Sequence, residues 1–173
     1  MLTTVFVGCK NESNSNDAND LTKQVPLEEG FRVSLEVIVK KDDSFHLYFT
    51  EDGTIDFGKN QPISAKVIGS ENAQNVIFNI PNDFFPNEFR FDLGSNLEQE
   101  EIILKSIKFD FKGKTKSLVG SEIGMYFRAD GTNCIYDIST GSIKGKVVDG
   151  KRLMPLLYPH EEALRLEIEK MMK

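Results

Sequence analysis

The sequence predicts an all-β fold: an antiparallel, two-sheet, jelly-roll-like sandwich followed by a short C-terminal helix. Two observations predict the sheets, namely segments in which apolar and polar residues alternate and turn residues that recur at intervals of roughly ten residues. The composition agrees, since 39% of the 173 residues are hydrophobic and 13 are Phe, which is enough to fill a core. We therefore expect one domain with appendages, and about eight to ten strands.

Three alternating segments lie between Asn75 and Phe111: residues 76–80, residues 88–93 and a segment that ends at Phe111. The second is the clearest, with three apolar residues on one face and three charged residues on the other. These are Phe89, Phe91 and Leu93, and Glu88, Arg90 and Asp92, respectively. The short connections predict that all three segments belong to one antiparallel sheet, whose apolar face needs a second layer.

Similar alternation predicts strands on both sides of this central stretch. The segments are residues 31–40, 45–50, 63–67, 123–128, 134–138 and 143–148. In the fourth of them we expect Ile123, Met125 and Phe127 to point inward. Polar turns separate the segments, so the folded domain is expected to span residues 25–158.

The C-terminal segment, residues 159–173, has a helical period instead. Pro159 suits the first turn of a helix, and acidic residues follow it where the helix dipole favours them. An apolar stripe consists of Leu164, Ile168, Met171 and Met172. Such a stripe usually packs on the core, and docking of a partner on it is the alternative.

The N-terminus has two parts. Residues 1–9 are uncharged and mostly apolar and end in Gly8 and Cys9, whereas residues 10–24 are polar and predict a disordered tether. The sequence Phe6-Val7-Gly8-Cys9 resembles the lipobox of bacterial lipoproteins, although Phe6 stands where that family usually has Leu. Because no Lys or Arg precedes Cys9, residues 1–9 are interpreted as the remnant of a signal peptide whose true start lies upstream.

The lipobox resemblance implies that a lipid is attached to Cys9, which becomes the mature N-terminus. It also implies that the chain is anchored by this lipid in the bacterial cell envelope, on the periplasmic or the outer side. We expect no other attachment to the membrane, since no apolar stretch is long enough to span a bilayer.

Charge and motifs restrict the function. A net charge of −6 and a pI near 5.0 argue against nucleic acid as a partner, and the lysines between Lys105 and Lys116 are interpreted as a solvated sheet edge or turn. We find no phosphate loop, metal-binding motif or catalytic triad pattern, and we expect neither enzymatic activity nor a cofactor. A hydrolase with paired carboxylates remains an alternative. Asp52 with Asp56, and Asp130 with Asn133, are interpreted as turns, with calcium binding as the alternative.

The candidate ligand-binding residues come from the polar side of the predicted central sheet. They are Tyr48, Gln74, Asn79, Arg90 and Asp92. A tyrosine beside arginine, carboxylate and amide groups can stack on a sugar and form hydrogen bonds with it. The alternative is a solvated sheet face on which Arg90 forms a cross-strand ion pair.

A second resemblance concerns residues 44–94, with FHLYFTEDG, QNVIFNIP and FRFDLG. This succession of strands and turns resembles the small β-sandwich modules of bacterial surface proteins that handle glycans. The resemblance implies non-catalytic carbohydrate binding, although the chain has no Trp, the residue best suited to sugar stacking. The alternative is a lipoprotein of envelope assembly whose partner is another protein. A groove around Tyr48, Arg90 and Asp92 would favour the first hypothesis, and a flat face with Arg90 paired would favour the second.

Overall fold

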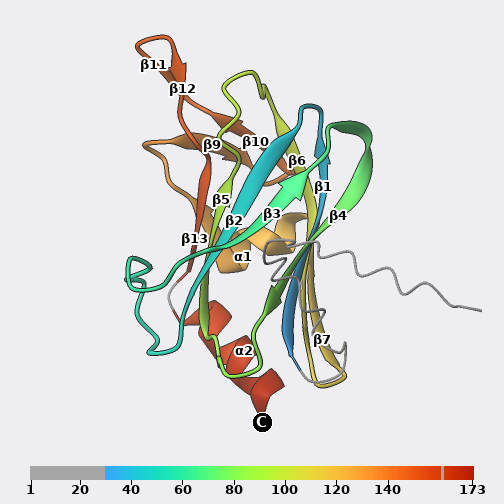
Figure 1. Cartoon of the computed structure of the whole chain (residues 1–173), viewed down its shortest axis with the longest axis vertical. Helices are drawn as coiled ribbons and strands as arrows, with labels where there is room; N and C mark the ends of the chain where they lie inside the picture. The colour runs from blue at the N-terminus through green and yellow to red at the C-terminus, as the bar shows by residue number, and fades with distance from the viewer. Residues whose placement is uncertain (1–29, 161) are drawn as a thin grey trace, which may run out of the picture.

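The chain forms two antiparallel sheets packed face to face, with a helix at the C-terminus (Figure 1). A computed structural model describes residues 30–160 and 162–173, so the predicted signal-peptide remnant, tether and lipidation at Cys9 lie outside the described residues. The elements are β1 (Phe31–Val39), β2 (Asp43–Thr50), β3 (Ile63–Val67), β4 (Ser70–Ile80), β5 (Glu88–Leu93), β6 (Ile102–Phe111), β7 (Lys114–Val119), the 3-10 helix η1 (Gly120–Glu122), α1 (Ile123–Tyr126), β8 (Phe127–Ala129), β9 (Cys134–Asp137), β10 (Ser142–Gly145), β11 (Val147–Val148), β12 (Lys151–Arg152), β13 (Leu156–Pro159) and α2 (Ala163–Met172).

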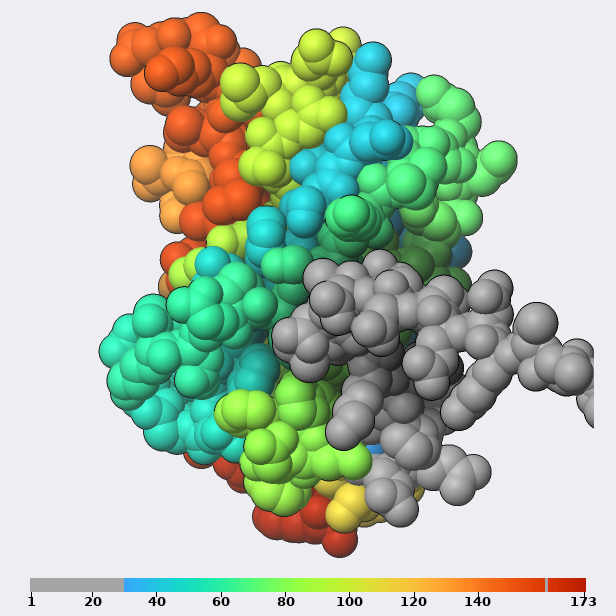
Figure 2. Space-filling view, viewed as in Figure 1, coloured from blue at the N-terminus to red at the C-terminus, as the bar shows by residue number. Residues whose placement is uncertain are grey.

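The first sheet has the strand order β4-β1-β6-β10-β9, with β7 also paired to β6, and the second has the order β3-β2-β5-β13-β8. A separate hairpin of β11 and β12 projects from the body (Figures 1 and 2). All sheet pairings among the described residues are antiparallel. The prediction of an antiparallel two-sheet sandwich with a C-terminal helix is therefore confirmed.

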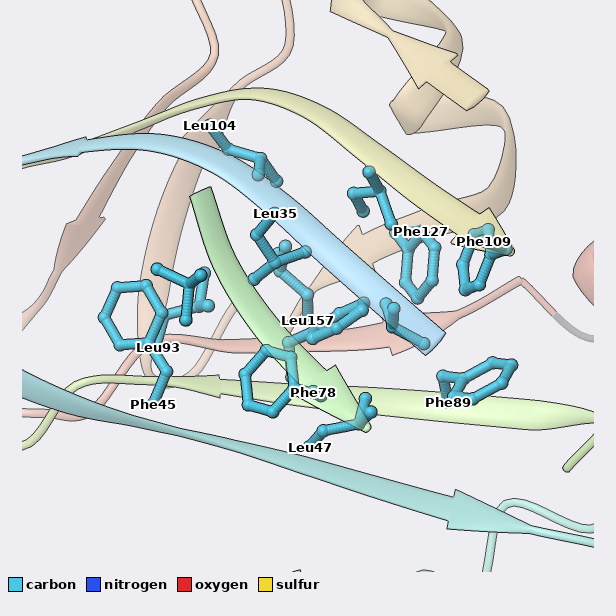
Figure 3. Packing of buried hydrophobic residues seen from close by; sticks show 14 of the residues in the cluster. Leu35, Phe45, Leu47, Phe78, Phe89, Leu93, Leu104, Phe109, Phe127 and Leu157 are labelled. Atoms are coloured by element: carbon cyan, nitrogen blue, oxygen red, sulfur yellow. The ribbon is translucent and has the colours of Figure 1, made fainter. Parts of the chain in front are cut away.

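The core lies between the two sheets and is rich in aromatic rings (Figure 3). Every residue predicted to point inward from β1, β2 and β5 is buried, because side chains alternate between the faces of a strand. Phe31 and Phe109 from the first sheet contact Phe89 from the second, with ring centroids 5.6 and 5.3 Å from that of Phe89. The rings thus join the sheets directly.

The prediction that the three central segments share one sheet is wrong. β4 and β6 lie in the first sheet, where both pair with β1, while β5 lies in the second. Leu35 of β1 has Val76 of β4 and Ile107 of β6 as its register partners. The connections on either side of β5 pass from one sheet to the other, and alternation alone does not distinguish such a crossing from a hairpin.

Two predicted boundaries are also corrected. Residues 123–126 of the predicted strand 123–128 form α1 instead, so Ile123 is buried but Met125 is exposed. Gly124 lets α1 pack closely against Ile138, because a Cβ atom at this position would lie 2.7 Å from the Ile138 side chain. Pro159 ends β13 instead of starting the helix, which begins at Ala163.

The apolar stripe of α2 packs on the core, as predicted, and does not form an exposed surface for a partner. Leu164, Ile168 and Met171 are buried in the core cluster, and Met172 packs against it. The stripe is therefore not available as a docking surface for a partner. Within the described residues, no helix is both long and apolar enough to cross a bilayer.

Candidate ligand-binding face

Three of the five predicted ligand residues lie together on the outer face of the second sheet. Tyr48 of β2 is the register partner of Arg90 of β5, and His46 is the partner of Asp92. These side chains point away from the core because Leu47, Phe91 and their alternating neighbours point into it.

Arg90 is the centre of this face. Its guanidinium donates two hydrogen bonds to the Asp92 carboxylate, from Nε to Oδ1 at 2.8 Å and from Nη2 to Oδ2 at 3.0 Å. The same guanidinium lies 4.0 Å from the ring centroid of Tyr48 and 5.5 Å from that of Tyr158. Arg90 is thus held by a two-point ion pair and by rings on two neighbouring strands.

The stack continues across four strands. Arg128 of β8 is the register partner of Tyr158 of β13, and its guanidinium lies 5.6 Å from the Tyr158 ring centroid. The order across the sheet is therefore Tyr48, Arg90, Tyr158 and Arg128, which we call the stacked row. Arg128 is exposed and the other three side chains are partly exposed, so the row forms part of the molecular surface.

Asp92 is nearly removed from water, and its side chain is 4% exposed. Burial raises the pKa of Asp92, and the hydrogen bonds and charge of Arg90, together with the nearby His46, only partly offset that effect. The pair is therefore a semi-buried structural ion pair, and a paired Arg90 is the arrangement stated above to favour the assembly hypothesis.

The loop between β2 and β3 covers part of this face. Phe57 from the loop is 3% exposed, with its ring 6.1 Å from that of Tyr158 and 5.6 Å from the Arg90 guanidinium. Because Phe57 is buried on the outer side of the sheet, it does not belong to the core cluster between the sheets. Phe57 therefore forms a small apolar cluster with Tyr158 beside Arg90, separate from the core.

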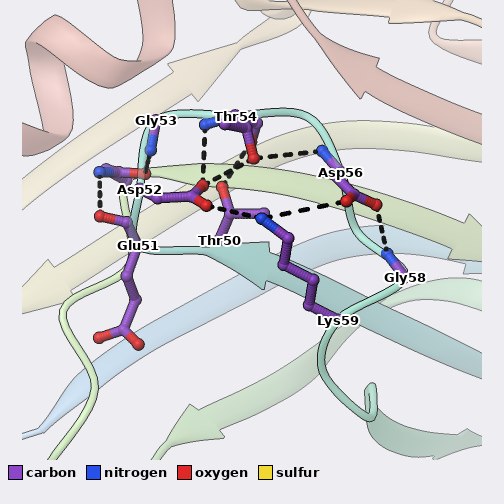
Figure 4. Close-up of polar contacts among 9 residues, drawn as sticks. Thr50, Glu51, Asp52, Gly53, Thr54, Asp56, Gly58 and Lys59 are labelled. Atoms are coloured by element: carbon purple, nitrogen blue, oxygen red, sulfur yellow. Dashed lines mark hydrogen bonds and ion pairs between the residues drawn. The ribbon is translucent and has the colours of Figure 1, made fainter.

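The same loop is ordered by the carboxylates considered for calcium (Figure 4). Asp52 accepts hydrogen bonds from the backbone and the hydroxyl group of Thr54, and Lys59 lies 2.9 Å from Asp52 and 3.9 Å from Asp56. The hydroxyl of Thr54, then the ammonium of Lys59, strongly lowers the pKa of Asp52. The lysine ammonium thus lies between the two carboxylates.

The second candidate calcium segment is also a turn. Asp130 accepts a hydrogen bond from the backbone of Thr132 through its carboxylate, and from that of Asn133 through its carbonyl. Among the described residues, no group of three or more His, Cys, Asp or Glu side chains is arranged to hold a metal ion.

The other two predicted residues lie elsewhere. Gln74 and Asn79 belong to β4 at the edge of the first sheet, where Gln74 donates a hydrogen bond to the carbonyl of Ile68 and Asn79 is the register partner of Arg32. They were grouped with Arg90 because β4 and β5 were expected to be neighbours in one sheet. The two strands are on opposite layers, so these amides do not join the stacked row.

Four further residues belong to the face and were not predicted from the sequence: His46, Phe57, Arg128 and Tyr158. The alternation of Leu156 and Tyr158 with buried Leu157 was available as a signal, but the segment is only four residues long and runs into Pro159. Phe57 carries no periodic signal, because it lies in a loop. Its proximity depends entirely on how the loop folds back.

Comparison with known proteins does not extend these observations. No protein-family model matches the chain, and no curated protein or solved structure matches it either. The fold and the outer face define the chain as a β-sandwich with an aromatic and charged surface, and its function has to be argued from that surface.

Proposed function

We propose that the chain is a non-catalytic carbohydrate-binding sandwich of the bacterial cell envelope, and that the stacked row is its binding face. The observation that carries this proposal is the alternation of tyrosine and arginine side chains across four adjacent strands. Phenol and guanidinium groups supply the hydrogen-bond donors and acceptors that sugar hydroxyl groups require.

Preorganisation supports the proposal. Arg90 is fixed by Asp92 and stacks on Tyr48, and Tyr158 lies against Phe57. A ligand that binds such side chains loses little additional rotamer entropy, which is a major cost of binding to flexible surface groups. The sheet scaffold also places the row on regular strands rather than on loops.

The stacking also determines how a sugar would be held. Because Arg90 lies 4.0 Å from the ring centroid of Tyr48, it covers one face of that ring. A sugar would therefore contact mainly the hydroxyl edges of Tyr48 and Tyr158 and the exposed guanidinium of Arg128. Hydrogen bonding, rather than ring stacking, is expected to supply most of the affinity.

A second candidate function is envelope assembly with another protein as partner. The observation that favours it is the pairing of Arg90 with Asp92, which engages Nε and Nη2 of the guanidinium. In that case the row serves to fix the loop that carries Phe57, and the partner docks on a different surface.

Binding can be tested with a glycan array probed by the full chain carrying Cys9→Ser, which keeps the protein free of lipid. Tyr158→Phe removes one hydroxyl group, and Arg128→Gln removes one exposed guanidinium. Each change is expected to weaken a bound glycan by roughly tenfold, the effect of losing one hydrogen bond to a bound ligand.

Matched controls lie away from the row. Tyr126→Phe on α1 removes a hydroxyl group, and Lys105→Gln at an exposed position of β6 removes a positive charge. Neither should change glycan affinity. A glycan that binds the row variants as well as the parent chain would disprove the site, and absence of any glycan hit together with capture of one defined envelope protein would favour assembly.

The envelope location is a separate proposal that rests on the sequence around Cys9. We propose that Cys9 carries a lipid in the mature protein. Intact mass measured after membrane extraction, from a chain that carries a complete signal peptide before Cys9, should equal the mass of residues 9–173 plus that of the attached lipid. An unmodified Cys9 would contradict the anchor without affecting the stacked row.

A further inference from the structure

The edges of the two sheets differ in how they are protected against pairing with another strand. Among the described residues, five strands lie at the edges of the two sheets. Four of these edge strands are at most six residues long and carry a charged residue: β3, β7, β8 and β9. The charged residues are Lys66 on β3, Lys114 and Lys116 on β7, Arg128 on β8 and Asp137 on β9. Charges and short length are the usual protection of an edge strand.

The fifth edge strand, β4, has only one charged residue, Glu71, which lies near its N-terminal end. It is the longest of the five, with 11 residues, and Ala73–Ile80 contains no charged residue. β4 pairs with β1 on one side, and within the described parts of the chain no strand pairs with its other side. It lies at the margin of the sandwich in Figure 1.

The outward side chains of β4 have a symmetric order. Ile77 is 47% exposed, and Asn75 and Asn79 on either side of it are exposed as well. The inward residues Val76 and Phe78 are equally spaced about Ile77 and are buried. An apolar residue flanked on both sides by an amide is complementary to a second copy of itself in the antiparallel direction.

We propose that β4 pairs with β4 of a second copy of this chain, antiparallel and with Ile77 opposite Ile77 on the two-fold axis. In this register, Asn75 of one copy lies opposite Asn79 of the other. Because side chains alternate along a strand, all outward residues stay on one face of the joined sheet and all inward residues stay on the core side. The first sheet then continues from one copy into the next.

The symmetric order of Asn75, Ile77 and Asn79 favours a second copy of the chain as the occupant, and the local charge is compatible with it. Antiparallel pairing of residues 74–80 with themselves brings no charged side chains opposite each other, although the chain as a whole has a net charge of −6. β3 precedes β4 closely, with only Ile68 and Gly69 between the two strands, which places the pairing on the second half of β4. The contact is limited to one pair of strands, so we expect a concentration-dependent dimer rather than a permanent one.

Sedimentation velocity of the full chain with Cys9→Ser tests the proposal over a range of concentrations. The parent chain should pass from monomer to dimer as its concentration rises. Ile77→Lys places two positive charges opposite each other on the axis and should weaken the dimer by about tenfold or more. Ile135→Lys on β9 is the matched control, since Ile135 is also exposed on an edge strand and should leave the dimer unchanged.

The register is tested by disulfide formation in a background without Cys9 and Cys134. Ile77→Cys should cross-link to itself, because residues opposite each other on antiparallel strands have Cβ atoms near disulfide distance. Asn75→Cys should not cross-link to itself. When the two variants are mixed, Asn75→Cys should form a disulfide with Asn79→Cys. A parent chain that stays monomeric, or an Ile77→Lys variant that dimerises like the parent, would overturn the proposal, and efficient self-linking of Asn75→Cys would overturn the register. None of these outcomes depends on glycan binding.

Discussion

The two outer faces of the sandwich each carry an arginine and an aspartate, yet the two pairs differ in almost every physical respect. On the first sheet, Arg32 of β1 lies 3.5 Å from Asp110 of β6, and Lys108 shares that carboxylate at 3.0 Å. On the second sheet, Arg90 binds Asp92 at two points and stacks on Tyr48. The Asp110 carboxylate is therefore shared by two cations, whereas among the described residues the Asp92 carboxylate binds the Arg90 guanidinium alone.

The environment of the two carboxylates differs accordingly. The Asp110 side chain is 16% exposed and that of Asp92 is 4% exposed. Burial tends to raise the pKa of both, but at Asp110 the hydrogen bond from Thr115 and the positive charges of Lys108 and Arg32 outweigh burial and lower the pKa. At Asp92 burial prevails and the pKa is raised.

The difference comes from what covers each face. Phe57 and Tyr158 lie over the arginine of the second sheet and exclude water from its aspartate. Two outer faces with the same alternating pattern can therefore differ. The first sheet carries a network of shared charges, and the second carries an arginine packed among aromatic rings. The loop and strand that arrive from elsewhere decide between the two.

The largest expected effect follows from breaking each pair. Asp92→Ala leaves the half-buried Arg90 without its carboxylate and should lower the free energy of unfolding by about 3 kcal/mol, the lower end for a broken buried pair. Asp110→Ala should cost less than about 1 kcal/mol, because its arginine and lysine remain accessible to water. Urea unfolding of both variants measures the difference.

Equal losses in the two variants would show that the covered face is no different from the open one. Asp92→Ala with Arg90→Leu provides the double-mutant test. If the cost arises from an unpaired guanidinium, the double variant should recover part of the stability that Asp92→Ala loses, because no buried charge remains.

The next effect concerns the cover itself. Phe57→Ala removes a buried ring from the outer face and should lower the free energy of unfolding by about 2 kcal/mol, which is less than for a ring in a core, because the loop can settle onto the sheet. Phe85 is 53% exposed, so Phe85→Ala is a control with the same change in side-chain size and an expected effect within about 0.5 kcal/mol.

A Phe57→Ala variant as stable as the Phe85→Ala variant would mean that the ring contributes nothing to the face. Chemical shifts of Tyr158 and of the Arg90 side chain, followed by NMR, would then show whether the loop has left the sheet. In the expected case both move, since Phe57 lies near both groups.

Much of the fold could be predicted from sequence because it depends on local alternation. Apolar residues alternate along Phe31–Val39 and residues 89–93, and each residue predicted to point inward is buried, whereas Ile38 on the outward face of β1 is partly exposed. The placement of β5 in the second sheet, with β4 and β6 in the first, could not be predicted in this way. It is set by pairing between strands that are distant in sequence, and alternation is identical for either layer.

The candidate site shows the same division. Tyr48, Arg90 and Asp92 were found because they alternate with buried residues on two strands that pair with each other. Gln74 and Asn79 were grouped with them by nearness in sequence, and the placement of β4 and β5 in different sheets separates them. Tyr158 and Phe57 reach the face through a short strand and a loop, neither of which has a periodic signal strong enough to place it.

The smallest expected effect is a difference of sign in the pH dependence of stability. The pKa of Asp92 is raised above its ordinary value of 3.8 in the folded chain, so the folded state holds this proton more tightly than the unfolded state. Its contribution to stability increases as the pH falls from neutral through the raised pKa toward 3.8. The pKa of Asp110 is lowered, so its contribution is complete above 3.8 and is lost as the pH falls through the lowered value.

The free energy of unfolding of Asp92→Asn and Asp110→Asn, each subtracted from that of the parent chain between about pH 7 and about pH 2.5, isolates the two contributions. As the pH falls, the advantage of the parent chain should grow relative to Asp92→Asn and shrink relative to Asp110→Asn. Two curves of the same sign would mean that the cover over Arg90 does not exclude enough water to outweigh the ion pair, and that the two faces are electrostatically alike.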